Sequence, residues 1–427
     1  MSLLNTPLEL PCGAVIPNRI CKAAMTEGLA DPYGTSTPAL EKLYQRWSEG
    51  GAGLLLTGNV MVDHRYLERA GNVIVENDKH LDALKRYAEA GTKAGNHLWM
   101  QISHPGRQCA RLVNDKPMSP SDVQLKMAGN YAKPTPMTAS DIDDVIERFV
   151  TTATIAKQAG FTGVQIHSAH GYLNSQFLSP VTNQRTDQWG GSLANRARLI
   201  LTIVRRVRDA VGAEFPICVK LNSADFQKGG FTLEECIQVA AWLGEERVDL
   251  LEISGGTYEH LTFFDEGHNE QRKSTQAREA YFMQYAKAIS EAAKIPLMIT
   301  GGFRSRQGME DALESKETDM VGVARPFCVD PDVAKKLLSG EIESTPSYDN
   351  KLVLGKGFWG PTSKSKTMQA FNNQCQAGWY YRHIIDLSEG KRPDVQLSAR
   401  KAFFKHMIND FKLTMTRRKA MKNIASA

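Results

Sequence analysis

The sequence lacks the cysteine pattern of a disulfide-stapled or cluster-binding protein. Its seven cysteines are scattered through 427 residues, and none forms a CxxC pair. An odd, dispersed set is typical of reduced thiols in the cytoplasm, and it offers neither zinc nor iron–sulfur spacing. We therefore expect a cytoplasmic protein without disulfides.

Long apolar runs are also missing. No stretch approaches the roughly 18 apolar residues that a membrane-spanning helix needs. The first residues, MSLLNTPLEL, lack the basic and apolar parts of a signal peptide. We expect neither a leader nor membrane association.

Positive charge is concentrated at one end of the chain. Residues 391–427 hold ten Lys/Arg and two Asp/Glu, a net +8, so the first 390 residues contribute about −3 to the total of +5. A basic tail without interleaved aromatic residues or a recognised module does not indicate nucleic-acid binding. We expect no nucleic-acid partner.

Continuous apolar runs recur along the chain, each followed by an amphipathic helical pattern. Such runs are typical of parallel strands buried on both faces. Eight strand–helix alternations favour a (β/α)8 barrel over a doubly wound sheet, because no GxGxxG motif follows an early strand. The predicted strands are residues 19–25, 53–58, 97–103, 163–167, 216–222, 249–254, 296–302 and 319–324.

Two segments exceed a minimal barrel. Residues 103–137 form a long polar loop, and such loops often cover active sites. Beyond about residue 346 the strand count is exhausted and helical patterns follow. We predict a barrel over 1–345 and a helical extension over 346–427.

The strand ends carry the residues with chemical potential, because active sites of such barrels lie at the carboxyl ends of the strands. Gly301 and Gly302 after the seventh strand, with Ala324 and Arg325 after the eighth, predict a phosphate site. The other ends are small or polar: Ala23, Ala24, Met25, Thr26, Gly58, Gln101, Lys220 and Ser254.

The fourth strand ends in HSAHGY, with His167, His170 and Tyr172 close together. Satisfied core histidines, half of a metal site and a catalytic group all fit this spacing. The pair lacks the glutamate of HExxH and an evident third ligand, so we predict no metal. The position at a strand end favours catalysis.

Longer motifs carry a family resemblance. The segments HSAHGYLNSQFLSPVTNQRTDQWGGSLANR, MQISHPGRQ, TGGFRS and VGVARPF are similar to those of the Old Yellow Enzyme family, over roughly residues 1–345. The resemblance implies FMN as cofactor and NADH or NADPH as reductant. It also implies reduction of the activated C=C bond of an α,β-unsaturated carbonyl or nitro compound.

The resemblance assigns roles residue by residue. His167 and His170 would bind the substrate oxygen, and Tyr172 would donate a proton to the α-carbon. The residues implied in FMN binding are Ala23, Ala24, Met25 and Thr26 against the flavin ring, Gly58 facing it, Gln101 at its pyrimidine edge, Lys220 near N1 and O2, and Gly302, Ala324 and Arg325 at the phosphate.

Three departures from the family qualify these roles. Thr26 replaces the cysteine of one branch, and Lys220 replaces the usual arginine, which keeps the charge but loses the planar fork. Only Cys375 lies beyond the barrel, so we expect no iron–sulfur cluster. Amine dehydrogenation, dienoyl-thioester reduction and a non-catalytic flavin-binding scaffold remain alternatives.

The last helical pattern has an apolar stripe and a basic polar face. The stripe can pack on its own barrel, on a neighbouring subunit or on an anionic membrane surface. We favour a neighbouring subunit, hence a homo-oligomer, and expect the tail aromatics Trp379, Tyr380 and Tyr381 to serve in packing. The stripe consists of Phe404, Met407, Ile408, Phe411 and Met415.

Overall fold

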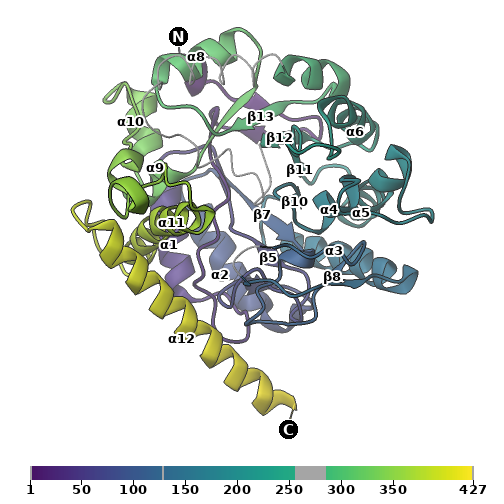
Figure 1. Ribbon diagram of the computed structural model, residues 1–427. Helices are drawn as coiled ribbons and strands as arrows, with labels where there is room; N and C mark the ends of the chain where they lie inside the picture. The colour runs from purple at the N-terminus through teal and green to yellow at the C-terminus, as the bar shows by residue number, and fades with distance from the viewer. Residues whose placement is uncertain (1, 127–128, 255–284, 426–427) are drawn as a thin grey trace.

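A closed parallel barrel forms the centre of the computed structural model, which describes residues 2–126, 129–254 and 285–425 (Figure 1). Eight parallel strands pair in a ring, because β10 bonds to both β11 and β7. In chain order they are β3 (Ile20–Lys22), β4 (Leu54–Leu56), β7 (His97–Ser103), β10 (Gly163–Ser168), β11 (Ile217–Asn222), β12 (Leu250–Ser254), β13 (Leu297–Thr300) and β14 (Met320–Val323). The predicted (β/α)8 barrel is confirmed.

Ring closure depends on a glycine. Gly163 of β10 pairs with Trp99 of β7. A Cβ on Gly163 would lie 2.5 Å from the Trp99 indole nitrogen. Only a residue without a side chain lets the two backbones approach here.

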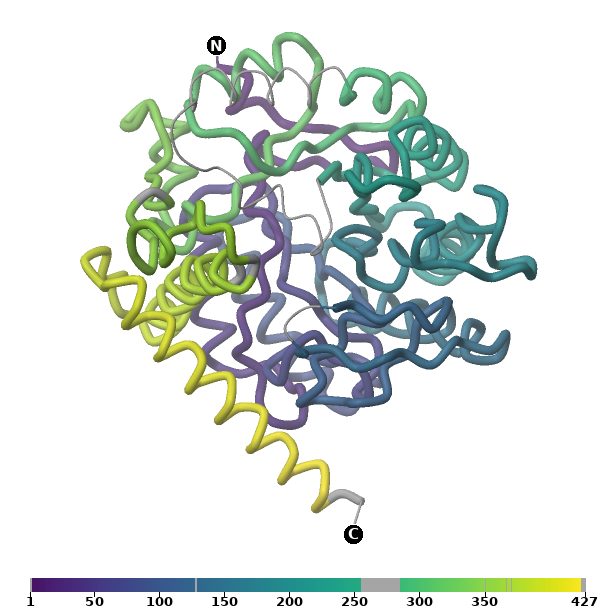
Figure 2. The backbone as a smooth tube through the Cα atoms, in the orientation of Figure 1, coloured from purple at the N-terminus to yellow at the C-terminus, as the bar shows by residue number. Residues whose placement is uncertain are grey.

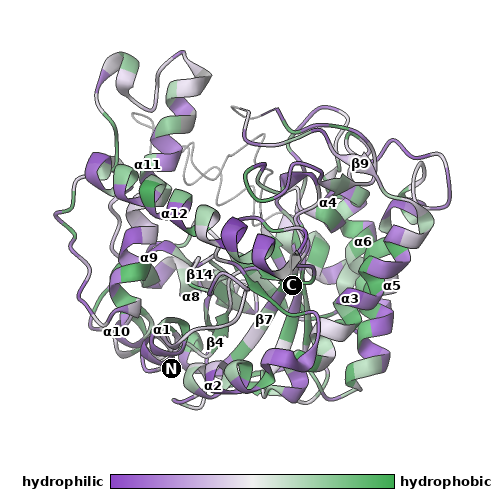
Figure 3. Cartoon of the chain, turned by 90° about the horizontal axis from the view of Figure 1, so that it is seen from below, coloured by the Kyte–Doolittle hydropathy of each residue, from purple (hydrophilic) through white to green (hydrophobic). Residues whose placement is uncertain are grey.

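Helices surround the barrel, and the apolar strands lie inside them (Figure 3). Capping boxes fix two helix starts, with Thr138 and Asp141 at α3 and Thr232 and Glu235 at α6. The segment 255–284, which follows β12, lies outside the described residues. The outer helices are α1 (Pro38–Ser48), α2 (Leu81–Gly91), α3 (Ala139–Gln158), α4 (Leu173–Leu178), α5 (Leu193–Val211), α6 (Leu233–Glu245), α8 (Arg306–Glu314), α9 (Arg325–Val329) and α10 (Val333–Ser339).

A short hairpin closes the amino end of the barrel. Strands β1 (Leu8–Glu9) and β2 (Val15–Ile16) pair antiparallel. Their buried Leu8 and Ile16 belong to an apolar cluster with Trp99 of β7 at the bottom of the barrel. Access to the barrel interior is therefore left to the carboxyl end of the strands.

The extension forms two long helices, α11 (Lys366–Ser388) and α12 (Ala399–Ala425). Helix α11 packs against α1, α9 and α12, and the backbone trace in Figure 2 shows α12 running along the outside of the barrel. Arg417 of α12 donates to the backbone oxygens of Pro32 and His64, at 2.9 Å each. The extension is thus tied to loops of the barrel.

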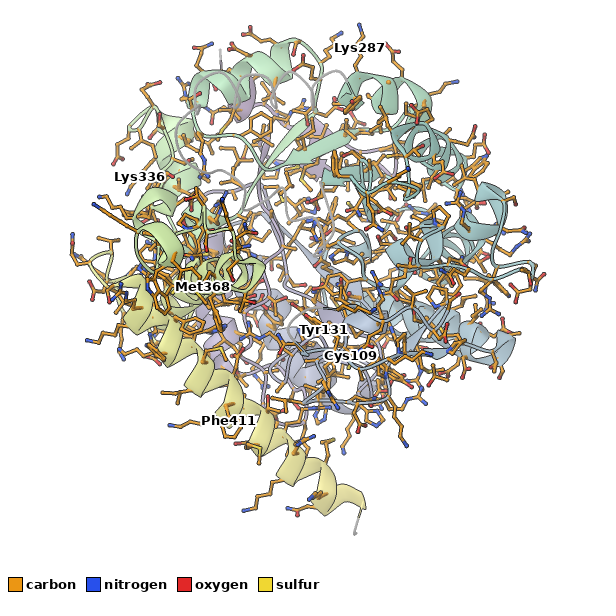
Figure 4. The ribbon with its side chains drawn as sticks, in the orientation of Figure 1. Cys109, Tyr131, Lys287, Lys336, Met368 and Phe411 are labelled. Carbon is orange, nitrogen blue, oxygen red and sulfur yellow. The ribbon has the colours of Figure 1, made fainter. Side chains whose placement is uncertain are left out.

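The apolar stripe of α12 faces solvent. Phe404 is 64% exposed and Phe411 58% exposed, and Phe411 is labelled on α12 in Figure 4. The opposite face, with Ala402 and His406, packs inward. Packing of this stripe on its own barrel, one of three arrangements considered, is therefore wrong. In the part of the chain that the structure describes, no helix could cross a membrane.

Acid should loosen the extension through His406. This side chain is stacked on Tyr381 of α11, with ring centroids 4.9 Å apart, and burial lowers its pKa to about 4. The unfolded chain therefore binds the proton first as pH falls below about 6.5, so stability decreases from there to about pH 4, by at most about 3 kcal/mol. Urea unfolding at pH 7, 5.5 and 4 measures this decrease.

The matched variants are His406→Gln and Lys405→Gln. The first should flatten the pH dependence, whatever its stability at pH 7. The second removes a neighbouring exposed side chain and should keep the wild-type dependence. An unchanged pH dependence in His406→Gln would assign the acid sensitivity to other groups.

Candidate active site

A cavity of about 300 Å³ opens at the carboxyl ends of the strands. Helix α11 contributes part of its wall. Most of the residues predicted for the site line this cavity: Ala24, Met25, Thr26, Gln101, His167, His170, Tyr172, Lys220, Gly302, Ala324 and Arg325. The topology thus brings together strand ends that lie up to about 300 residues apart in the sequence.

Two predicted residues stand behind the cavity wall. Ala23 is fully buried, and neither Ala23 nor Gly58 is among the lining residues. The backbone N–H of Gly58 donates to Glu27 at 2.8 Å. A Cβ on Gly58 would lie 2.7 Å from the Cα of Thr26, so Gly58 allows Thr26 to take its place in the wall.

One end of the cavity suits an anion. Gly301 and Gly302 adopt φ angles of 108° and 83°, which favour glycine. The carboxylate of Asp349 pairs with Arg304 at 2.9 Å and Arg325 at 2.8 Å. Asp349 precedes α11, so the extension orients the two arginines beside the glycine turn.

Asp349 is also held from α11. It accepts hydrogen bonds from the Tyr380 hydroxyl at 2.8 Å and from Gln376 at 3.1 Å. The sequence gave no sign that this aspartate would meet the phosphate-site arginines, because no motif surrounds it and loop conformation decides its position.

The other end of the cavity suits a polar heterocycle. Gln101 and Lys220 line it, both nearly fully buried. Lys220 Nζ lies 2.8 Å from Glu252 Oε1, and Gln101 Nε2 donates to Gln165 Oε1 at 2.6 Å. Glu252 and Gln165 lie beneath the lining residues and were not predicted, because inward-facing polar residues of strand centres look like ordinary barrel filling in sequence.

The histidine pair and Tyr172 form one cluster. His167 lies 5.2 Å from His170 and 4.8 Å from Tyr172, measured between ring centroids. Burial lowers the pKa of both histidines well below its usual value, and the nearby Lys220 charge acts in the same direction. Both imidazoles are therefore neutral near pH 7.

The tautomer of His167 follows from its hydrogen bond. The Ala169 backbone N–H donates to His167 Nδ1 at 3.2 Å. A neutral imidazole with an accepting Nδ1 carries its proton on Nε2. His167 therefore offers an N–H donor, which suits a partly negative oxygen.

The His170 backbone is held in an uncommon conformation. Its φ of 59° lies in the left-handed region, which is costly for a non-glycine residue and is over-represented at functional sites. Asn222 accepts the His170 N–H at 3.0 Å, and Gln108 donates to its carbonyl at 3.1 Å. The loop after β7 thus supports the histidine pair.

A carboxylate near Thr26 was not predicted. Thr26 donates its hydroxyl proton to Glu68 at 2.9 Å, and Asn59 donates to the same oxygen at 2.6 Å. Glu68 and Asn59 both line the cavity. Glu68 sits in a loop without a motif, so only the folded chain reveals it.

Helix α11 supplies a wall of the cavity. Ala377, Tyr380, Tyr381 and Ile384 line it. The expectation that Tyr380 and Tyr381 serve in packing alone is therefore wrong. Trp379 is fully buried and donates to the Leu397 carbonyl at 2.8 Å, as packing requires.

A second group of potential ligands lies apart from the cavity lining. Asp63, His64 and Glu76 bring one ligand atom each within 4.8 Å of the others. Arg65 pairs with Asp63 at 2.6 Å, and Arg148 pairs with Glu76 at 2.8 Å. The carboxylates are neutralised by these arginines, so we assign no metal to the group.

Comparison with known proteins identifies the family. Residues 4–343 match the NADH:flavin oxidoreductase / NADH oxidase family. The chain belongs to this family. The match confirms the recognised resemblance, an FMN cofactor and a nicotinamide reductant.

Individual relatives agree with the family match. The chain is 37% identical over 358 residues to the NADH-dependent flavin oxidoreductase nadA of Aspergillus parasiticus, which covers 80% of each chain. It is 36% identical over 354 residues to the NADH-dependent flavin oxidoreductase iliE of Neonectria sp., covering 77% of this chain but 46% of that protein. The chain thus spans about half the length of that relative.

A solved structure shares the fold. The old yellow enzyme homologue from Zymomonas mobilis superposes with a TM-score of 0.67 and 24% identity, covering 81% of this chain and 95% of that one.

The residues present fit FMN at both ends of the cavity. Open left-handed glycines and two arginines suit a phosphate. Gln101 and Lys220 suit the imide edge of an isoalloxazine, where carbonyl oxygens flank an N–H. An FMN oxidoreductase of this family needs these two ends within one cavity.

Phenol binding should report on the histidine pair in the FMN-loaded protein. A para-substituted phenolate offers an anionic oxygen to two neutral imidazole donors, and its stacking on flavin gives a long-wavelength absorption band. His167→Ala and His170→Ala should abolish this band, whereas Tyr172→Phe should retain it. Stoichiometric zinc in the purified protein would instead indicate a metal site.

Proposed function

We propose that this oxidoreductase reduces the activated C=C bond of α,β-unsaturated carbonyl or nitro compounds with electrons from NADH or NADPH. The observation that carries the proposal is the neutral histidine pair beside Tyr172, in a cavity with a phosphate-binding and a heterocycle-binding end. Neutral imidazoles donate hydrogen bonds without adding a charge.

Each residue has a separate task in this proposal. Bound FMN supplies a hydride for the β-carbon of the alkene. His167 donates Nε2–H to the carbonyl or nitro oxygen, which draws electron density from the alkene. His170 supports the same oxygen, and its ring is held by Ser254 Oγ at 2.8 Å from Nε2.

Tyr172 completes the reaction by giving a proton to the α-carbon. Its ring lies against His167, and its side chain is almost fully buried. Burial limits competition from water, so the phenol is the proposed general acid. The roles of Ala23, Ala24, Met25, Thr26 and Gly58 near the flavin ring remain part of the proposal.

Turnover of NADPH with 2-cyclohexenone tests the reaction. Tyr172→Phe should slow the step that consumes enone by about 100-fold, because a general acid contributes 10²–10⁴-fold. Reduction of FMN by NADPH should stay unchanged, since no proton passes to an α-carbon there. Stopped-flow absorbance separates the two half-reactions.

Tyr33→Phe is the matched control, because Tyr33 is 50% exposed and is not a cavity-lining residue. It should behave as wild type in both steps. Absence of enone turnover in the FMN-loaded wild type would favour another flavin reaction or a flavin-binding scaffold.

We also propose that the exposed stripe of α12 contacts a second copy of the chain. Five large apolar side chains exposed on one helix exceed the scattered apolar residues of ordinary surfaces. Exposed Lys401, Lys405 and Lys412 run along one flank. Two such helices paired antiparallel would place like charges together, so the second copy would meet the stripe with an acidic surface of its barrel.

Sedimentation velocity tests the contact. The triple variant Phe404→Ser, Ile408→Ser and Phe411→Ser should shift the protein to a smaller species, because the contact loses its apolar centre. Val15→Ser with Leu112→Ser removes exposed apolar groups elsewhere and should leave the species unchanged. A monomeric wild type that floats with anionic vesicles would favour the membrane arrangement.

For the compartment, we propose the cytoplasm. All seven cysteines are unpaired, and six of them are buried. Free thiols in this number suit a reducing environment.

A further inference from the structure

A buried hydrogen-bond chain runs beneath the heterocycle end of the cavity. Glu252 of β12 is fully buried and does not line the cavity. Its Oε2 accepts from Gln165 Nε2 at 2.6 Å, and its Oε1 lies 2.8 Å from Lys220 Nζ. Gln165 Oε1 in turn accepts from Gln101 Nε2 at 2.6 Å.

The carboxylate sets the direction of this chain. An ionised carboxylate only accepts hydrogen bonds, so Gln165 must turn its amide nitrogen toward Glu252 and its oxygen toward Gln101. Gln101 must then point its nitrogen at Gln165, since the reverse orientation would face two carbonyl oxygens. This leaves Oε1 and one amide hydrogen of Gln101 for the cavity, which matches the N–H and carbonyl of an imide edge.

The same carboxylate offsets the charge of Lys220. Burying an ion is costly unless it is paired and hydrogen-bonded, and both oxygens of Glu252 meet that condition. Lys220 is the partner of Glu252 and also a cavity-lining residue. The cavity floor therefore holds a neutral pair rather than an isolated cation.

We propose that Glu252 is a positioning residue for the FMN pyrimidine ring: through Gln165 it fixes the amide direction of Gln101, and through Lys220 it limits the positive charge at the cavity floor. The inference rests on the proposed placement of FMN against Gln101 and Lys220. It concerns a residue that contacts neither cofactor nor substrate.

The charge part is tested by the midpoint potential of bound FMN. Glu252→Gln keeps an acceptor oxygen but removes the negative charge, so reduced FMN should be favoured at least tenfold, a rise of about 30 mV for a two-electron couple. Lys220→Met leaves Glu252 without its cation and should shift the potential in the opposite direction. Dye-equilibrated titrations at pH 6 measure both. An unchanged potential in Glu252→Gln would overturn this part.

The orientation part is tested by FMN affinity. Gln165→Met breaks the amide chain but keeps the pair of Glu252 and Lys220, so FMN should bind at least tenfold more weakly at an unchanged potential. Fluorescence titration of the apoprotein gives the dissociation constant. Equal affinity in Gln165→Met and wild type would overturn the orientation role, also where Glu252→Gln fails to fold.

Asp249→Asn is the matched control, because Asp249 is also a buried carboxylate, paired with Arg208, just before β12. It should lower thermal stability and leave both FMN potential and affinity unchanged. A wild type that binds no FMN would refute the proposed function itself. Normal FMN binding with wild-type values in every Glu252 and Gln165 variant would refute this inference alone.

Discussion

The pairing of β7 with β10 is the constraint on which the site depends. It closes the ring of strands, and its register puts Gln165 opposite Gln101. The pairing of β10 with β11 puts His167 opposite Lys220. The side chains that would hold a heterocycle and those that would polarise a substrate are thus fixed by one continuous hydrogen-bond ladder, and a shift by one residue would turn every one of them to the opposite face.

Charge balance within the barrel follows from that ladder. The adjacent strands β11 and β12 bring Lys220 and Glu252 into register, so a cation needed near a cofactor has its counter-ion in the next strand. The lowered pKa of His167 and His170 has burial as its main cause and Lys220 as a further one. A site with two neutral imidazoles and one compensated lysine can accept an electron-rich ligand without an excess of positive charge that would trap it.

Sequence reasoning predicted the barrel because all eight strands are continuous apolar runs, and it predicted most of the cavity because the residues that end those runs meet at one edge. It missed Glu252, Gln165, Glu68 and Asp349. The first two occupy strand interiors, where a polar residue has no periodic signature. The last two belong to loops, whose positions depend on tertiary contacts such as that of Asp349 with Arg325. Local patterns carry no information on such contacts.

The extension shows why a boundary drawn from composition is incomplete. Residues beyond 345 add no strand to the barrel, yet α11 lines the cavity and holds Asp349 through Tyr380. Tyr381 lies under Arg69, 4.4 Å from the ring centroid, and the same arginine pairs with Asp410 of α12. Arg69 adjoins Glu68, which accepts from Thr26. The packing of α12 on α11 is therefore coupled, through one arginine, to the cavity wall at Thr26.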